Sequence, residues 1–298
     1  MMSKNLSILV NSCDLYESVW DPFFKLFAIQ WPDCPYDIYL NTETKSYECD
    51  FLNVKTICTG NDVPWTVRLK KALKEIDAEY ILFFLEDFFL LDKVDVSSFD
   101  KIFRAMQQDP SIGFLFFNPL GIEWHRSHHN INDFCSETKW HCVYRANACI
   151  GLWRKEFLLQ VLFLDGNPWT FEYYATRLSR IAKYKCCSVH KEYENVLPYS
   201  ILPELGYGIT KRQWLLKNKE LFDKYDIDVD FDVLGIQDSQ EDMPKTAGNS
   251  MCTSPQKKKS SIKETVRKKV KFLKFRLRTG PKFRKYCRQI HQEMYGDK

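Results

Sequence analysis

YILFFLEDFFLL, residues 80–91, consists of two apolar runs separated by the carboxylates Glu86 and Asp87. The first run, residues 80–85, is apolar at every position, as is typical of a strand in a parallel sheet that helices cover on both faces. The stretch is interrupted by charge and is shorter than the roughly 20 apolar residues that a membrane-spanning helix requires. It therefore predicts a core strand with two acids at its carboxyl end.

Strand and helix patterns alternate on either side of this strand. The expected elements are strands at 6–10, 36–40, 112–118 and 148–153 and one near Ser188, just before His190, and helices at 16–30, 65–76 and 155–163. This alternation predicts an α/β fold with a mainly parallel central sheet flanked by helices. In such folds ligands bind at the carboxyl ends of the strands, so Asp14 and Glu86-Asp87 are expected at one edge of the sheet.

Composition and charge divide the chain into parts. With 45% hydrophobic and 28% charged residues, the 298-residue chain is too apolar for a disordered protein and too charged for a multi-span membrane protein. Residues 257–298 carry 16 Lys and Arg against three acids, a net charge of +13, which leaves −9 for residues 1–256. We expect a catalytic or binding domain over 1–235, a flexible linker over 236–261 and a basic helical tail over 262–298.

The tail has the pattern of an amphipathic helix. One apolar stripe is formed by Ile262, Val266, Val270, Leu273 and Leu277. Such a helix suits an anionic membrane surface, so we expect residues 262–290 to bind one. Nucleic acid is the competing partner, which the acidic charge of residues 1–256 disfavours.

The N-terminus and the cysteines indicate a cytoplasmic protein. The first apolar run is only five residues long, so it does not resemble a secretory signal. The 11 cysteines include no CxxC pair and are expected to be reduced, with Cys142, Cys149, Cys186 and Cys187 behaving as small buried apolar residues. Together with the tail, this predicts a cytoplasmic protein that associates peripherally with the inner face of the cell membrane.

Glu86-Asp87 is the strongest candidate site. Buried charges are costly unless they are paired or bind a cation, although a strand-end acid can also cap the next helix. Mg²⁺ or Mn²⁺ is commonly held by one or two carboxylates together with substrate phosphates, which fits a nucleoside diphosphate. No GxGxxG, GxxxxGK[ST] or GxSxG motif is present, which disfavours dinucleotide, P-loop and serine-hydrolase interpretations.

The sequence resembles the GT-A type of nucleotide-sugar glycosyltransferase, and more closely the bacterial enzymes that build capsular and surface polysaccharides. The resemblance is carried by ILVNSCD at 8–14, WDPFFKLF and WPDCPYDIYLNTET between 20 and 44, the helix at 65–73 with YILFFLEDFFL, and GLWRKEFL and NPWTFE between 151 and 172. In order and spacing these segments span most of residues 6–235. The resemblance implies a GT-A fold and a nucleoside-diphosphate sugar as donor.

The resemblance also implies donor-binding residues. Asn11 and Asp14 would bind the base or ribose, and Arg68 would meet the diphosphate with bidentate hydrogen bonds. Glu86 and Asp87 stand where the family carries an Asp-x-Asp-like motif. Because the two acids are adjacent and Glu comes first, the sequence leaves open which of them contacts a metal ion.

On the acceptor side, Glu172 corresponds to the general base of inverting members. The other interpretation of Glu172 is an acid at a helix N-terminus, stabilised by the macrodipole, with Asp165 as the fallback base. Trp169 and Phe171 are suited to stack on sugars, and His128 is expected to contact the acceptor.

The expected metal ligands are Asp87 and His190, binding Mn²⁺ or Mg²⁺. A lone histidine is more often structural, and the histidines at 125, 128 and 129 lack zinc-ligand spacing.

These residues predict a glycosyltransferase that moves a sugar from a nucleoside-diphosphate sugar to a glycan or lipid-linked acceptor with inversion, in surface polysaccharide biosynthesis. The alternative is a non-catalytic protein that binds nucleic acid or membrane through its basic tail.

Overall fold

The computed structural model describes residues 5–117, 126–199, 208–210, 212–237 and 280–289. The chain divides into two units, residues 1–237 and 238–298. In the second unit, the described residues 280–289 form a helix. The stripe expected between 262 and 277 lies outside the described residues, so it stays a prediction. None of the helices described is both long and apolar enough to cross a bilayer.

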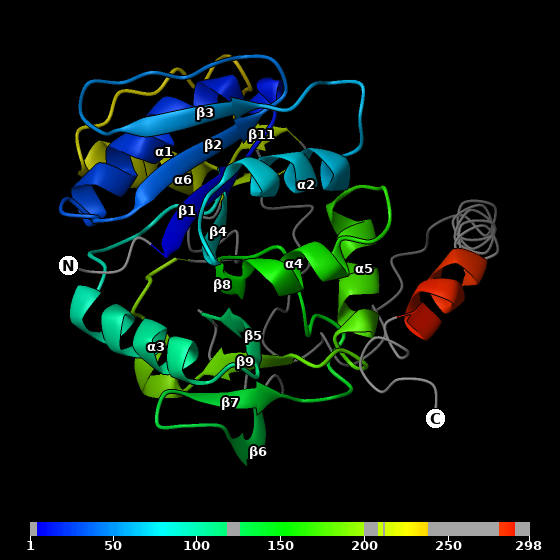
Figure 1. Cartoon of the computed structure of the whole chain (residues 1–298). Helices are drawn as coiled ribbons and strands as arrows, with labels where there is room; N and C mark the ends of the chain where they lie inside the picture. The colour runs from blue at the N-terminus through cyan, green and yellow to red at the C-terminus, as the bar shows by residue number, and fades with distance from the viewer. Residues whose placement is uncertain (1–4, 118–125, 200–207, 211, 238–279, 290–298) are drawn as a thin grey trace, which may run out of the picture. The chain divides into compact units, whose positions relative to one another are not determined.

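The first unit is an α/β structure in which helices flank one large sheet (Figure 1). Its elements are, in order, β1 (Leu6–Asn11), η1 (Asp14–Tyr16), α1 (Glu17–Gln30), β2 (Asp37–Thr42), β3 (Val54–Cys58), α2 (Trp65–Glu75), β4 (Tyr80–Leu85), α3 (Val96–Gln108), β5 (Ile112–Phe116), β6 (Arg126–Asn130), β7 (Cys135–Thr138), β8 (Gly151–Arg154), α4 (Lys155–Val161), α5 (Pro168–Leu178), β9 (Lys185–Val189), η2 (Lys191–Tyr193), β10 (Ile209–Thr210), β11 (Gln213–Trp214) and α6 (Leu216–Lys224).

The sheet is mostly parallel, as expected. Its strand order over the described residues is β3-β2-β1-β4-β8-β5-β9-β7-β6. Strands β3, β2, β1 and β4 run parallel to one another, while β8 is antiparallel to both of its neighbours. Asn11, the last residue of β1, pairs with Leu85 at the end of β4 and with Asn41 in β2, so these strands end at one edge. The fold is thus a Rossmann-like α/β fold with a mostly parallel central sheet flanked by helices.

Strand β4 shows why helices cover both faces of the sheet. Successive side chains of a strand point to opposite faces, and both Phe83 and Phe84 are buried. Phe84 packs against Phe23 and Phe27 of α1, whereas Phe83 packs against Trp65 of α2. Helices α2, α4 and α5 lie next to one another (Figure 1).

Most of the expected elements are confirmed to within a few residues, with one correction to the strands. The strand expected near Ser188 is β9, which ends at Val189 and is followed by the 3₁₀ turn η2. The strand expected at 148–153 begins only at Gly151, because residues 139–150 form an irregular segment. That segment brings backbone to the edge where β4 ends.

Several elements were not expected from the sequence, and α3 is the largest. The sequence does contain features of this helix. Asp95 is an N-cap residue whose side chain accepts a hydrogen bond from Ser98 N, and the buried residues of α3 follow at helical spacing. Strands β3 and β7 gave little signal, since they are short and only partly apolar. Helix α6 buries just two residues, Asn218 and Phe222.

Candidate functional site at the carboxyl edge of the sheet

The loops that follow β1, β2 and β4 meet at one edge, as the sequence predicted for Asp14 and Glu86-Asp87. Three neighbouring parallel strands end in register there. The charges of Glu86 and Glu43 both raise the pKa of the Cys13 thiol, after burial as the main cause, so the three loops are close together.

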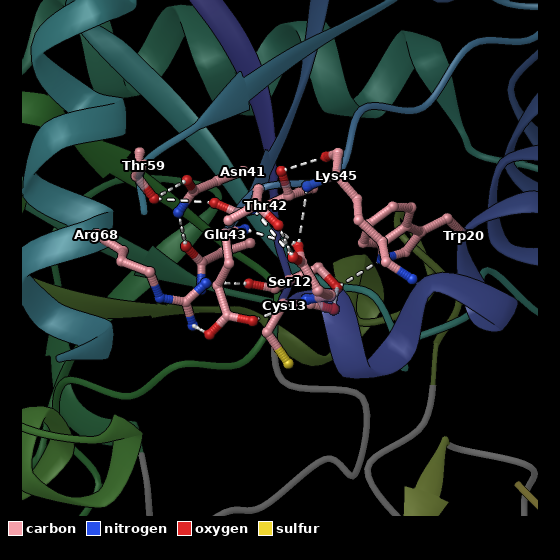
Figure 2. A network of polar contacts seen from close by, with 12 residues as sticks. Ser12, Cys13, Trp20, Asn41, Thr42, Glu43, Lys45, Thr59 and Arg68 are labelled. Carbon is pink, nitrogen blue, oxygen red and sulfur yellow. Dashed lines mark hydrogen bonds and ion pairs between the residues drawn. The ribbon is translucent and has the colours of Figure 1, made fainter. Parts of the chain in front are cut away.

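Asp14 holds the loop after β2. Its carboxylate accepts hydrogen bonds from the backbone N–H groups of Glu43, Thr44 and Lys45, and from the Thr44 hydroxyl. In return, the Glu43 carboxylate accepts a bond from Asp14 N at 3.1 Å. Burial disfavours ionisation of Asp14, but the hydrogen bonds from Thr44 and its neighbours outweigh it and lower the pKa. Asp14 thus holds the loops after β1 and β2 together, and Figure 2 shows Ser12 and Cys13 of the first loop beside Thr42 and Glu43 of the second. Its expected contact with a nucleotide stays a prediction.

Asn11 lies beneath this clamp in a buried amide chain. Its Oδ1 accepts a 2.6 Å hydrogen bond from Asn41 Nδ2, and Asn41 Oδ1 in turn accepts one from the Thr59 hydroxyl. Asn11 is 1% exposed, and among the described residues its Nδ2 has no hydrogen-bond partner. A buried donor without a partner costs about 1–3 kcal/mol, so this donor is a point of stored instability at the edge of the sheet.

Arg68 is buried between the first two loops (Figure 2). Its Nη1 donates to the backbone oxygen of Ser12 at 2.9 Å, and its Nη2 lies 3.7 Å from Glu43 Oε1. Ser12 is also fixed from the other side, because Trp20 Nε1 donates to its hydroxyl at 2.7 Å. The guanidinium therefore has a defined position at the edge of the sheet.

Glu86 follows β4 and is buried. Burial raises its pKa, and the charge of Asp87 raises it further. The Ser12 hydroxyl and the Arg68 charge act in the opposite direction, which places Glu86 beside the Arg68 position. Glu86 is thus poised to be neutral or charged according to what binds near it.

Asp87 lies under the segment that leads into β10. Burial raises its pKa, and the backbone N–H of Ile209 opposes this by hydrogen bonding to the carboxylate. A Cβ at Gly208 would lie 2.6 Å from Asp87 Oδ2, and Gly208 has a φ of +35°. Glycine is therefore required where this segment crosses the acid.

Glu172 reaches the same edge from α5. Its Oε1 accepts a 3.1 Å hydrogen bond from Ala148 N, in the segment before β8. Burial raises the pKa of Glu172, with that bond acting against it. The pKa of the Cys149 thiol is raised by burial and by the charges of both Glu172 and Asp87, so the two carboxylates approach Cys149 from different elements.

Helices α2 and α5 are tied together, which couples the positions of Arg68 and Glu172. Thr66 N donates to Gly166 O at 3.0 Å, and Gly166 N donates to the Thr66 hydroxyl at 2.8 Å. Trp65 and Phe171 pack across the same junction, with ring centroids 5.7 Å apart. Asp165, the fallback base, is exposed beside this junction.

Phe171 and Trp169 differ although both were expected to stack on sugars. Phe171 is 4% exposed and packs between Trp65 and Trp153, so that expectation is corrected: it is a core residue. Trp169 is 73% exposed on the first turn of α5, one turn from Glu172. Its availability for stacking stays a prediction. The side chain of His128 lies outside the described residues.

His190 is held within the protein. Its Nε2 lies 2.9 Å from the Ser136 hydroxyl and its Nδ1 lies 3.1 Å from Asp133 O. It follows β9, which is three strands from β4, or about 14 Å at the usual strand spacing. The structure therefore does not bring His190 to Asp87.

The residues at the edge fit a metal ion only in part. Among the residues that the structure describes, no three His, Cys, Asp or Glu side chains are grouped to hold one. Asp87, with its buried carboxylate, suits an ion that takes most of its ligands from substrate phosphates and water. His190 does not fit, because both ring nitrogens have other partners.

Sequence reasoning missed three participants. Glu43 completes the loop clamp, and Cys149 follows Ala148, whose N–H donates to Glu172. Tyr144 is close to Glu172, whose charge raises the pKa of the phenol after burial. Glu43 follows a strand at the same edge as Asp14, so the rule that strand ends converge could have found it; Tyr144 and Cys149 lie in an irregular segment that has no periodicity.

Comparison with known proteins found similarity to solved structures alone. No family model and no curated protein sequence matches this chain. Among the structures, S. aureus TarS 1–349 is 13% identical, with a TM-score of 0.41 over 62% of this chain and 57% of that chain. The same protein in complex with UDP-GlcNAc gives 14% and 0.42, over 62% and 55%. A cytidylyltransferase from Leptospira borgpetersenii gives 12% and 0.36, over 74% and 95%.

The extent of these matches limits what they describe. At 12–14% identity they concern the fold alone, a sheet flanked by helices. The match spans little more than half of the TarS chain.

Proposed function

We propose that this protein is a glycosyltransferase that moves a sugar from a nucleoside-diphosphate sugar to a hydroxyl of a glycan or lipid-linked acceptor. The proposal includes inversion at the sugar carbon and a role in surface polysaccharide synthesis. The observation that supports it is the placing of charged groups at the carboxyl edge of the sheet: Arg68 is held there by Ser12 O at 2.9 Å, and Glu172 is held by Ala148 N at 3.1 Å beside the start of β8. A fixed arginine and partly buried acids at the carboxyl edge of such a sheet suit an anionic donor and a proton transfer.

In this proposal the donor lies along the β1–β4 edge. Arg68 would donate to the diphosphate and stabilise the negative charge of the leaving group, since a fixed guanidinium costs no reorganisation during reaction. The free Asn11 Nδ2 would donate to the nucleotide. Glu86, beside Arg68, would accept a hydrogen bond from the ribose.

Glu172 would act as the general base. It would accept the proton of the acceptor hydroxyl while the oxygen attacks the sugar carbon and the bond to the diphosphate breaks. Its raised pKa makes it a stronger base than an exposed glutamate. Trp169, exposed one turn away, would contact the acceptor.

The proposal also includes Mn²⁺ or Mg²⁺, held by Asp87 and by donor phosphate oxygens. When bound there, such an ion neutralises charge on the diphosphate.

Glu172→Gln tests the assignment of the base. We expect it to lower the rate of transfer by about 10²–10⁴-fold, because a positioned base contributes that much. Transfer would be measured with UDP-, GDP-, CMP- and dTDP-sugars, after donors have been selected by thermal shift with and without Mn²⁺. The donor-induced shift should be unchanged in the variant, since Glu172 is assigned to the acceptor.

Asp165→Asn is the matched control. It removes an exposed carboxylate close in sequence and should leave transfer near the wild-type rate. If Asp165→Asn abolishes transfer and Glu172→Gln does not, the base is misassigned. If no donor raises the melting temperature under any condition, the proposed function is wrong.

We further propose that the basic residues 257–298 bring the enzyme to an anionic membrane surface, close to lipid-linked acceptors. The support is the charge of +13 in this segment. Co-sedimentation with vesicles containing anionic lipid should be lost when residues 257–298 are deleted, and should weaken with salt. Equal sedimentation of the full and shortened chains would contradict it.

A further inference from the structure

The outer face of α5 carries a row of aromatic and arginine side chains. Trp169, Tyr173 and Arg177 follow one another at intervals of four residues, which places them on one side of the helix. Arg180 continues the row two residues after the helix ends at Leu178. The segment before β8 adds Trp140, which is 56% exposed.

Both arginines are stacked on aromatic rings. Arg177 Cζ lies 3.4 Å from the centroid of the Tyr173 ring, and Arg180 Cζ lies 5.1 Å from that of Trp140. A guanidinium that is stacked through its face keeps its N–H donors in its own plane, where they can bind a carboxylate or phosphate.

These guanidiniums keep unused donors. Arg177 Nη1 donates to Tyr173 O, and Arg180 donates through Nε to Trp140 O and through Nη2 to Cys142 O. Since a guanidinium has five N–H donors, each arginine retains several. The bonds from Arg180 fix Trp140 and its segment against α5.

Among the described residues, the row has no acidic partner. Buried Arg145 nearby pairs with Glu137 at 2.6 Å, but no described carboxylate lies within ion-pair distance of Arg177 or Arg180. Burial lowers the pKa of Arg180, and the charges of Arg177 and Arg145 lower it further. The helix dipole favours cations at this end, but it does not account for their stacking on aromatic rings.

The row leads away from Glu172 along the same helix. At 1.5 Å per residue, Arg177 lies about 7.5 Å from Glu172 along the axis, and Arg180 follows beyond the end of the helix at Leu178. Trp169 is the member of the row that lies one turn from Glu172, so a chain bound along the row would reach the base at its Trp169 end.

We propose that Trp169, Tyr173, Arg177, Arg180 and Trp140, the α5 row, bind the acceptor, and that this acceptor is an extended glycan carrying carboxylate or phosphate groups. Sugar rings stack on the exposed indoles, and the anionic groups bind the stacked guanidiniums. The inference rests on the proposed function for the place of the row beside the base, and its test is independent of transfer.

The test measures binding of defined probes to the full chain. An oligogalacturonate supplies sugars with carboxylates, maltohexaose supplies neutral sugars, and polyphosphate supplies charge without sugar. We expect oligogalacturonate to bind most tightly. Arg177→Gln with Arg180→Gln should weaken its binding by at least tenfold, and Trp140→Ala with Trp169→Ala by several-fold.

Matched variants separate the row from general charge and from misfolding. Lys101→Gln with Arg104→Gln removes two charges from the exposed surface of α3 and should leave binding unchanged. Arg177→Gln alone keeps the Arg180 bonds to residues 140 and 142, and should still weaken binding. Unfolding curves for every variant identify any that fail to fold.

Three outcomes overturn the inference. The first is that folded Arg177 variants bind oligogalacturonate as tightly as the wild-type protein. The second is that the α3 control loses as much oligogalacturonate affinity as the row variants. The third is that polyphosphate binds at least as tightly as oligogalacturonate and that the tryptophan changes do not alter binding. If a donor raises the melting temperature but the row variants bind glycan like the wild-type protein, this inference alone is contradicted. If the row variants lose glycan binding but no donor raises the melting temperature, the proposed function is contradicted and the row remains a binding site for anionic glycans.

Discussion

The loops after β1 and β4 end at the same edge of the sheet, yet their acids have opposite fates. The Asp14 carboxylate accepts hydrogen bonds from four donors in the loop after β2, and these bonds lower its pKa. Desolvation raises the pKa values of Glu86 and Asp87, and the hydrogen bonds that the described residues give them do not offset it. The surroundings of Asp14 favour its ionised form, whereas those of Glu86 and Asp87 favour the neutral form.

This difference separates acids that build the site from acids that are left to act in it. A carboxylate with its acceptor capacity filled gains little from a ligand, because new bonds must replace existing ones. Buried carboxylates with raised pKa values gain from a cation or donor brought by a ligand. The contrast shows that Asp14 holds the loop after β2, and it is consistent with the proposal that Glu86 and Asp87 bind a ligand.

Asp14→Asn tests the structural side of the contrast and should have the larger effect. Losing the charge weakens several hydrogen bonds at once, so we expect about 2 kcal/mol less unfolding free energy at pH 7, moderated by partial exposure. Because the folded pKa lies below the ordinary 3.8, this stabilisation is present above about pH 4 and is lost as the pH falls through the folded value. Urea unfolding between pH 3 and 7 measures it.

Asp33→Asn provides the control, since Asp33 is an exposed acid in the loop before β2. It should change the unfolding free energy by less than about 0.5 kcal/mol at every pH. If the two variants behave alike, the clamp does not stabilise the fold and the contrast fails on this side.

Much of the sheet edge could be predicted from the sequence. The continuous apolar run at residues 80–85 indicated a central strand, and the rule that parallel strands end at one edge brought Asp14 to Glu86-Asp87. The roles within the edge were harder to predict, because they depend on donors from other loops. Nothing in the sequence around Asp14 shows that Thr44 and Lys45 will fold back onto it.

Helix α5 shows the same limit. The segment NPWTFE suggested one functional patch, but helical geometry turns Phe171 into the core and leaves Trp169 outside. His190 was expected near Asp87 because it follows a strand, but the strand order places β8 and β5 in between. Strand order depends on long-range pairing, which local patterns do not encode.

Glu86→Gln tests the acids with raised pKa values. We expect it to change the unfolding free energy less than Asp14→Asn does, and to raise it rather than lower it. Because the folded pKa of Glu86 is raised above its ordinary 4.5, the folded state binds this proton more tightly than the unfolded state. The wild-type protein should therefore lose stability as the pH rises from about 5 towards the raised value, whereas the glutamine variant is spared that loss. In chelator-treated buffer we expect the variant to gain about 1 kcal/mol over wild type between pH 5 and 8.

The control for this change is Glu75→Gln, which removes an exposed acid at the end of α2. It should track the wild-type protein across the same pH range, because it leaves Glu86 and the other acids of the sheet edge unchanged. A Glu86→Gln variant that is less stable than wild type at pH 8 would mean that the ionised acid is stabilised in the fold by Arg68 and Ser12. Glu86 would then belong with Asp14 among the residues that build the site, and Asp87 alone would remain to meet the ligand.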